Sequence, residues 1–360
     1  MQLDLVSVRG PILFDTAFLA DSLRQLLHRS ETALQVWSHV APWAALLVLA
    51  GLVIRLPVFP CLGWFHSAAT SAPIGISILM TTVIPLAAVS EWLRLGMPLF
   101  GLDQGMVSGT LGLLSLAGLW QNVLVLRSET DVKRMLIAIS SAMLCVSGIA
   151  LSFQQFDAIR GAWLLVVSQG LAIGGGLLIA QYLQARAGTC DLRRIGDQMA
   201  QSRQLSEMLT LVLLFWAGVP LIGVAAALTL IFSAVPADSV WLAIAMSVGL
   251  VLVAIASLSA ITRLATVVGH DKAAVTGIGP EAHGLDLTAS EWLAVIPFFG
   301  LLVFVNVSPE LFLKPCRPGF LRAAQVSKQA ATTQNAIRSS GSPRQSLPLT
   351  ARTVAGTARP

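Results

Sequence analysis

Apolar residues fill most of the chain in long runs, which short polar segments interrupt at nearly regular intervals. A helix that spans a bilayer needs roughly 20 consecutive apolar residues, which is more than an ordinary β-strand contains. The pattern predicts eight spans, at residues 40–58, 72–90, 105–126, 135–153, 160–182, 205–232, 241–262 and 289–311. We therefore expect an all-α fold, a polytopic bundle of about eight transmembrane helices.

Two of the predicted spans carry residues that break a helix. The first runs through Pro57 and Pro60, and the sixth carries Gly218 and Pro220 near its middle. Proline lacks an amide donor, so carbonyl groups near each break become free to bind ions or water. Transporter-like bundles use discontinuous helices of this kind, and the alternative is a pair of ordinary proline kinks. We expect both spans to be discontinuous.

The two ends of the chain differ from its apolar body. Residues 14–36 place apolar side chains at helical spacing with charges between them. This predicts an interfacial amphipathic helix in an N-terminal arm, residues 1–39, or else a loop helix packed on neighbouring chains. The transmembrane domain takes residues 40–312. Eight of the 23 basic residues and none of the 18 acidic residues follow it, so residues 313–360 are predicted to form a basic disordered tail.

Composition excludes several classes of protein. With 55% apolar and 11% charged residues, the chain is not a water-soluble domain, which carries about 25% charged residues. The net charge is +5, but the basic residues of the tail have no aromatic partners, so no nucleic-acid binding is expected. The four cysteines are scattered without a CxxC pair, which predicts no metal site and no redox cofactor in this chain.

Basic residues gather in the short loops on one side of the predicted bundle. With eight spans both termini share a side, and the loops on the other side hold Lys133, Arg134 and Arg186 among others. The remaining short loops hold only Arg94 and Arg160. By the positive-inside rule the basic loops are cytoplasmic. We expect a multi-pass protein in the lipid bilayer of a bacterial-type inner (cytoplasmic) membrane.

Four motifs follow one another along the middle of the chain. They read Arg-Leu-Pro-Val-Phe-Pro at 55–60, Asp-Val-Lys-Arg at 131–134 ahead of Ser140 and Ser141, Gln-Gly-Leu at 169–171, and Gly-x-Pro at 218–220. In this order and at these separations they resemble the antiporter-like membrane subunits of respiratory complex I, most closely the NADH-quinone oxidoreductase chain M family. The cation/proton antiporter subunits and membrane-bound hydrogenase subunits are related branches that share the motifs.

The resemblance covers residues 40 to about 312 and corresponds to the last eight of the family's fourteen spans. It implies a non-catalytic membrane-arm subunit whose family role is proton translocation coupled to quinone reduction. Its partners would be other membrane-arm subunits of a complex I-like assembly. NADH, flavin, iron–sulfur clusters and quinone would belong to partner subunits, with no cofactor in this chain.

The family moves protons through buried ionisable groups, and this chain differs at nearly every such position. The family lysine of the second predicted span corresponds to Leu86, and the family glutamate after the second break corresponds to Leu228. The two family histidines correspond to Met143 and Gln169. None of these four side chains titrates. We therefore expect an impaired relay, and a chain that on its own conducts protons poorly.

Four residues remain as proton-path candidates: Arg55, Gln169, Ser77 and Ser140. Arg55 holds the basic position of the family, but a guanidinium stays a fixed cation. We expect it to bind carbonyls freed by the prolines, or a carboxylate of a partner chain, unless it reaches the headgroups. Gln169 can order a water, and the serines can bond between helices.

Two other functions stay open at this point. One is a structural or assembly subunit that keeps the packing surfaces of the family and has lost transport. The other is a cation/proton antiporter subunit or a membrane-bound hydrogenase subunit. Every carboxylate in the predicted spans lies within a turn of a span end, which counts against a sodium site, because sodium prefers oxygen ligands.

Overall fold

The structure, a computed structural model, describes residues 43, 46–93, 104–188, 190–191, 203–217, 224–271 and 287–314. Within these ranges the elements are helices, apart from one isolated bridge between Asp131 and Asp191. The main ones are a short helix Leu46–Arg55, α3 (Leu62–Ser71), α4 (Ile74–Glu91), α6 (Gln104–Ser128), α7 (Val132–Ser152), α8 (Phe156–Ala187), α10 (Arg203–Trp216), α11 (Ala225–Ser233), the 3-10 helix η3 (Ala237–Ser239), α12 (Val240–Asp271) and α13 (Ala289–Val307).

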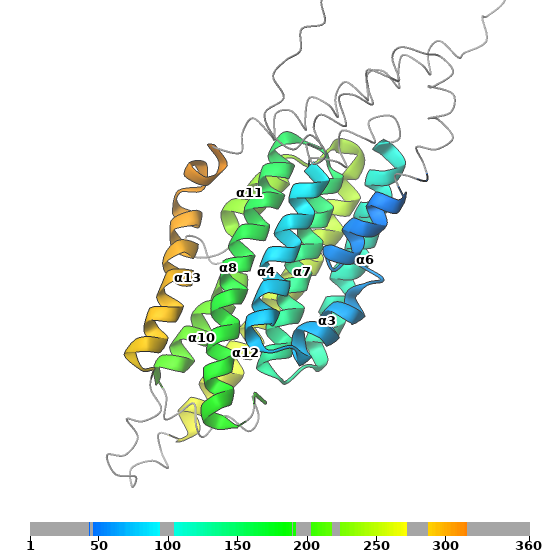
Figure 1. The fold of residues 1–360 in the computed structure, drawn as a ribbon. Coiled ribbons are helices and arrows are strands. Elements are labelled where there is room, and N and C mark those ends of the chain that lie inside the picture. The colour runs from blue at the N-terminus through cyan, green and yellow to red at the C-terminus, as the bar shows by residue number, and fades with distance from the viewer. Residues whose placement is uncertain are drawn as a thin grey trace, which may run out of the picture.

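Six helices in the described ranges are long and apolar enough to cross a membrane, namely α4, α6, α7, α8, α12 and α13. Each coincides with one of the predicted spans. Their axes run in roughly the same direction, so the chain forms a bundle (Figure 1). The prediction of an all-α polytopic membrane bundle is therefore confirmed.

The other two predicted spans are interrupted in the structure. Helix Leu46–Arg55 ends ahead of Pro57, and α3 begins at Leu62 after a turn. Likewise α10 ends at Trp216 and α11 begins at Ala225, and the two occupy opposite ends of the bundle in Figure 1. Gly218 and Pro220 lie outside the described residues, as do the N-terminal arm at 1–39 and residues 315–360 of the tail.

Helix α7 forms the centre of the bundle. Within its apolar span 94% of the residues are buried, against 28% in α4 and 22% in α13. Helices α6 and α8 pack along it, and α3, α4 and α12 also contact it. A helix that is apolar or small on every face can be buried on every face, which is the pattern that α7 shows. Side chains of α7 therefore reach several different neighbours.

The outer helices present apolar side chains away from the bundle. On α12 the exposed apolar residues recur every three or four positions: Trp241, Ile244, Val248, Val251, Ile255 and Leu258. This spacing places them on one face of the helix. Such a continuous exposed apolar stripe is the surface that a membrane protein turns toward lipid or toward neighbouring helices.

Charged residues fix the beginning of α7. The carboxylate of Asp131 accepts a hydrogen bond from the Arg134 amide at 3.0 Å, which caps the helix. Lys133 donates through Nζ to the carbonyl oxygens of Thr70 at 2.7 Å and Ala72 at 3.0 Å. A cation at these carbonyls complements the negative end of α3. The charged motif at 131–134 thus caps one helix and ties it to another.

Two glycines let the first break approach the seam between α6 and α7. A Cβ atom on Gly118 would lie 2.9 Å from the Cys145 sulfur and 3.0 Å from the backbone nitrogen of Phe59. A Cβ atom on Gly148 would lie 2.4 Å from the Ser115 hydroxyl oxygen. Both distances are shorter than carbon contacts allow, so the close approach depends on glycine at both positions.

Candidate functional site

The turn that follows helix Leu46–Arg55 lies against a hydrogen-bonded group of side chains. We call this group, made up of His66, Asn122, Ser141, Cys145 and the carbonyl of Pro57, the first-break cluster. His66 Nε2 lies 2.8 Å from the Ser141 hydroxyl oxygen. That hydroxyl donates to Asn122 Oδ1 at 2.6 Å. The cluster therefore joins α3, α6 and α7.

The freed carbonyl of the break has a partner within this cluster. The Cys145 thiol donates to the Pro57 oxygen at 3.5 Å, and Asn122 Nδ2 lies 3.8 Å from the Cys145 sulfur. Asn122 Nδ2 also donates to the carbonyl of Gly118 at 2.9 Å. Asn122, Ser141 and Cys145 are fully buried. Buried polar groups cost free energy unless they are paired, so these bonds make the cluster possible in an apolar bundle.

A second set of bonds starts from the neighbouring serine on α7. Ser140 donates to Gln169 Oε1 at 2.8 Å, and Gln169 Nε2 lies 3.3 Å from the Thr81 carbonyl oxygen. Thr81 in turn donates to the Ser77 carbonyl at 2.9 Å. Ser77 donates to the Ala69 carbonyl of α3 at 2.7 Å. We call this set the Gln169 chain, and it runs from α7 through α8 and α4 to α3.

The structure brings three of the four predicted proton-path candidates together. Ser140, Gln169 and Ser77 all belong to the Gln169 chain. Because Ser140 and Ser141 are consecutive, the Gln169 chain and the first-break cluster meet on α7. Polar atoms without a partner in the described ranges lie along the same helices, at the hydroxyls of Ser115 on α6 and Ser168 on α8.

Arg55, the fourth candidate, forms an ion pair with Glu91 at the end of α4. About half of each side chain is exposed, 49% for Arg55 and 53% for Glu91. We expected Arg55 to bind freed carbonyls, a carboxylate of a partner chain or the headgroups; among the described residues it pairs with Glu91 of its own chain. The reason is geometric, because α4 returns along the bundle and brings its last residue beside Arg55. The Pro57 carbonyl meanwhile accepts the Cys145 thiol.

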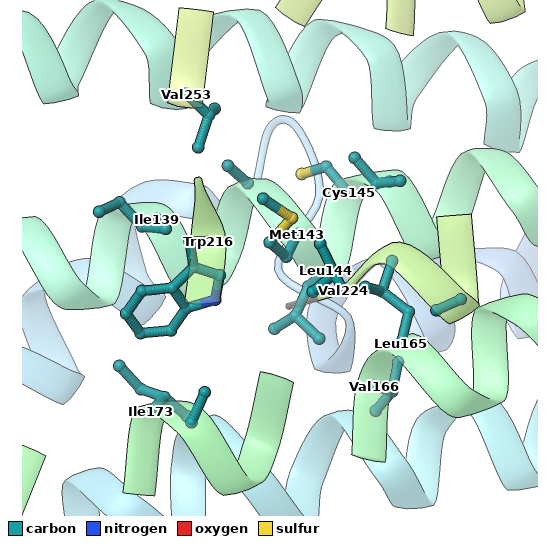
Figure 2. Packing of buried hydrophobic residues seen from close by; sticks show 14 of the residues in the cluster. Ile139, Met143, Leu144, Cys145, Leu165, Val166, Ile173, Trp216, Val224 and Val253 are labelled. Carbon is teal, nitrogen blue, oxygen red and sulfur yellow. The ribbon is translucent and has the colours of Figure 1, made fainter. Parts of the chain in front are cut away.

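The opposite side of α7 has a different character. Met143, the counterpart of a family histidine, lies in an apolar group with Ile139, Ile173, Trp216 and Val224, which we call the Met143 face (Figure 2). All five are at most 1% exposed. The Trp216 ring nitrogen has no hydrogen-bond partner within the described ranges. The positions Leu86 and Leu228 are half-buried and pack against the same apolar core.

Sequence reasoning missed α3 and with it His66. The apolar pattern predicts a connection between two spans at residues 58–72, because this segment is too short to form a span of its own. A helical signal was nevertheless present, since Leu62, Phe65 and Ala69 follow one another at helical spacing and are all buried. Asn122 was missed because nothing in the sequence distinguishes it from a polar residue at the edge of a span.

The sulfur of Cys190 lies beyond the end of α8, close to the charged start of α7. The backbone carbonyl of Cys190 accepts a hydrogen bond from the Val132 amide at 3.0 Å. Burial, together with the nearby Asp131 carboxylate, raises the pKa of the Cys190 thiol to about 11. The thiol is therefore protonated and unreactive at neutral pH.

Comparison with known protein families identifies a family model that covers most of the chain. The model described as NADH:quinone oxidoreductase/Mrp antiporter, transmembrane, matches residues 20–253. NADH-quinone oxidoreductase subunit M of Escherichia coli K12 is 24% identical over 155 residues, which is 43% of this chain and 30% of that protein. Subunit N of Desulforudis audaxviator is 27% identical over 173 residues, 47% of this chain and 33% of that protein. The aligned part of the chain thus spans about a third of these relatives.

Solved structures share the fold. Respiratory complex I from Thermus thermophilus with bound NADH contains a chain with a TM-score of 0.71 and 21% identity, covering 88% of this chain and 65% of that chain. An archaeal respiratory membrane complex, the membrane-bound sulfane sulfur reductase, gives a TM-score of 0.68 at 18% identity over 88% and 61%. The Mrp complex from Dietzia sp. DQ12-45-1b gives 0.63 at 13% identity over 89% and 68%.

Proposed function

Because the chain belongs to the NADH:quinone oxidoreductase/Mrp antiporter transmembrane family, we propose that it is a membrane-arm subunit of a complex I-type NADH-quinone oxidoreductase. Its role there is proton translocation coupled to quinone reduction. The observation that carries this proposal is a discontinuous helix whose break contacts a buried, hydrogen-bonded cluster inside an apolar bundle. Buried polar groups in a membrane bundle are costly, and they mark ion and proton pathways.

The setting of the protein follows from the same proposal. The chain resides in a bacterial-type inner membrane with its short basic loops in the cytoplasm. Its partners are other membrane-arm subunits, which pack on the exposed apolar faces of the bundle. NADH oxidation and quinone reduction take place in partner subunits, which hold the flavin, the iron–sulfur clusters and the quinone. This chain then contributes the membrane part of the coupling.

The apolar Met143 face supports the proposal that the family relay is impaired in this chain. A proton crossing at Met143 would have to pass five buried apolar side chains, and none of them can hold it. Leu86 and Leu228 offer no group that titrates either. Proton movement through this subunit therefore depends on the polar side of α7 and on what the assembled complex adds to it.

The same face favours a second candidate function, a structural or assembly subunit without transport. Replacing Leu86 with Lys and Leu228 with Glu in the assembled complex separates the two. If the subunit is purely structural, the double variant loses stability and gains no pumping. The reason is that a buried charge without a partner costs on the order of several kcal/mol. Increased pumping in a stably assembled double variant contradicts the structural role.

Purification of the tagged chain from native membranes in mild detergent tests the assembly. We expect it to copurify with a complex that oxidises NADH, reduces quinone and acidifies the outside of reconstituted vesicles. The matched control is the same tag on an unrelated polytopic protein. A chain that purifies without quinone-reducing activity contradicts the proposal.

A further inference from the structure

His66 is the feature of the bundle interior that the proposed function leaves unused. It is an ionisable side chain of α3, the short helix that follows the first break; it is half-buried, and none of the family positions quoted above includes it. Ionisable groups at such positions are costly and are kept for function. Its imidazole contacts a fully buried pair, Ser141 and Asn122, through a chain of two short hydrogen bonds. This arrangement can hold a proton-carrying group in a fixed position.

The hydrogen bonds determine which ring nitrogen of His66 carries the proton. The Ser141 hydroxyl has one proton, and both of its other neighbours, Asn122 Oδ1 at 2.6 Å and the Ala138 carbonyl at 3.0 Å, are acceptors. The hydroxyl therefore donates to one of them and accepts from His66 Nε2. Asn122 keeps this orientation because its Nδ2 donates to the Gly118 carbonyl. Neutral His66 is thus the Nε2–H tautomer, and Nδ1 is the nitrogen that accepts a further proton.

The charged and titratable groups of the described residues on the helices near His66 lie mostly at helix ends. They are Asp131, Lys133 and Arg134 at the start of α7, Arg127 and Glu129 at the end of α6, and Glu91 with its partner Arg55 at the end of α4. Lys133 is occupied by the Thr70 and Ala72 carbonyls, and Asp131 caps α7. Within α7, the Cys145 thiol donates to the Pro57 carbonyl. Among the groups named here, the imidazole is the one whose ordinary pKa lies near neutral pH.

We propose that His66 is a proton-binding site in the interior of the bundle. It carries protons on the polar side of α7, because the Met143 face has no group that can bind one. A proton arriving from the hydrogen-bonded surroundings binds Nδ1 and converts the imidazole to imidazolium. Nε2–H stays bonded to Ser141, and release from Nδ1 restores the neutral ring. No bond other than N–H forms or breaks. The role in translocation rests on the proposed function, whereas the proton binding itself does not.

Nitrogen NMR of the histidine side chains tests the proton binding directly. The full chain is labelled with ¹⁵N-histidine in phospholipid nanodiscs, and the difference from H66Q isolates His66 from the other histidines. We expect a neutral Nε2–H ring at about pH 8 that converts reversibly to imidazolium as the pH is lowered to about 4.5. A ring that stays neutral throughout, or that carries its proton on Nδ1, overturns the proposal.

The two consecutive serines of α7 provide a matched pair of variants. S141A removes the acceptor of the Nε2–H bond, so we expect the Nε2 signal to move and the Nδ1–H tautomer to become populated. S140A removes a bond to Gln169 and leaves the His66 signal unchanged. Circular dichroism of both variants verifies the fold. A His66 signal that S141A does not alter, in a folded protein, contradicts the assigned hydrogen bond.

Proton translocation by the assembled complex tests the role. A positioned proton-transfer group contributes about 10²-fold or more, so H66Q should reduce translocation through this subunit by that factor while quinone reduction in partner subunits continues. Unchanged translocation in assembled H66Q overturns the inference and leaves the proposed function standing. A native assembly that reduces quinone without translocating protons contradicts the proposed function. In that case the NMR titration still tests whether His66 binds a proton.

Discussion

Two sides of α7 pack against their neighbouring helices in different ways, one through hydrogen-bonded polar side chains and the other through apolar side chains. Toward α3 and α6, the helix presents Ser141 and Cys145, which join the first-break cluster. Toward α10 and α8, it presents Met143 within a group of five apolar side chains (Figure 2). Both sides face a discontinuous helix, so a helix break does not by itself require polar surroundings.

The difference shows where chemistry remains possible in this bundle. The first break keeps a carbonyl, a thiol, an amide, a hydroxyl and an imidazole in contact, whereas the Met143 face keeps only carbon, sulfur and an unpaired ring N–H. A proton can bind on the first side and has no acceptor on the second. Met143, Leu86 and Leu228 thus pack against the apolar core, whereas Gln169 is hydrogen-bonded.

The largest expected effect comes from placing a charge in the Met143 face. M143K should destabilise the chain by at least about 3 kcal/mol, because a buried ammonium without a partner is not compensated. The matched control M143L keeps the volume and should cost less than about 1.5 kcal/mol. Unfolding in SDS followed by circular dichroism measures both. Equal stability of M143K and M143L would show that this face is hydrated.

The ion pair at the first break comes next. R55Q or E91Q leaves one half-exposed charge unpaired, and the expected cost is at most about 2.5 to 3.5 kcal/mol, the value that insertion scales assign at the centre of a span. The double variant R55Q/E91Q removes both charges and should recover most of the loss. The same unfolding assay applies in nanodiscs. If the double variant loses the sum of the two single effects, the residues do not interact.

Packing of the break into the helix seam gives a third comparison. G118A places a methyl group against the Cys145 sulfur and the Phe59 backbone, and overpacking of this kind costs about 1 to 3 kcal/mol. G109A on the same helix meets no atom within 4 Å, so it is the control. Thermal unfolding compares the two. A tolerated G118A would place the break further from α6 than we describe.

Two buried asparagines sharpen the contrast between polar groups with and without partners. Asn122 binds groups on α6 and α7, so N122L should cost about 1 to 3 kcal/mol. Asn306 donates only to its own helix, and its Oδ1 has no partner within the described ranges. N306L should therefore be neutral or stabilising. A larger loss for N306L than for N122L would reverse the account of the cluster.

The smallest effect concerns the Cys190 thiol. Its folded-state pKa of about 11 lies above the ordinary thiol value of about 8.5, so the folded chain holds this proton more tightly. At pH 8.5 alkylation of Cys190 should be more than a hundredfold slower than after unfolding, roughly in step with its thiolate fraction. The linked stability is full below the unfolded-state pKa and declines as the pH rises toward 11. Fast alkylation of the folded chain would contradict its burial.

Much of the bundle could be predicted from the sequence, because long apolar runs and prolines act locally. The six long helices, the two discontinuities and the capping role of Asp131 all follow from neighbouring residues. The partners of Arg55 and His66 could not be predicted. Glu91 lies 36 residues from Arg55 and Ser141 lies 75 residues from His66, so only the packed bundle brings them together.

Helix α3 shows a second limit of prediction from the sequence, because the hydropathy pattern does not predict it. Its ten residues mix buried apolar positions with His66, Thr70 and two serines, so it lacks the run of about 20 apolar residues by which a span is recognised. The hydroxyls of Thr70 and Ser71 donate back to carbonyls of their own helix, which lets a polar segment remain helical inside the bundle. A hydropathy pattern cannot register this compensation.

Proton flux through the purified chain in liposomes tests the central claim most directly. Leu86, Met143, Gln169 and Leu228 carry no group that titrates, and His66 alone does not make a continuous path. We therefore expect uncoupler-sensitive acidification close to that of protein-free liposomes, with the M143L chain indistinguishable from the native chain. Strong uncoupler-sensitive flux by the native chain alone would contradict it.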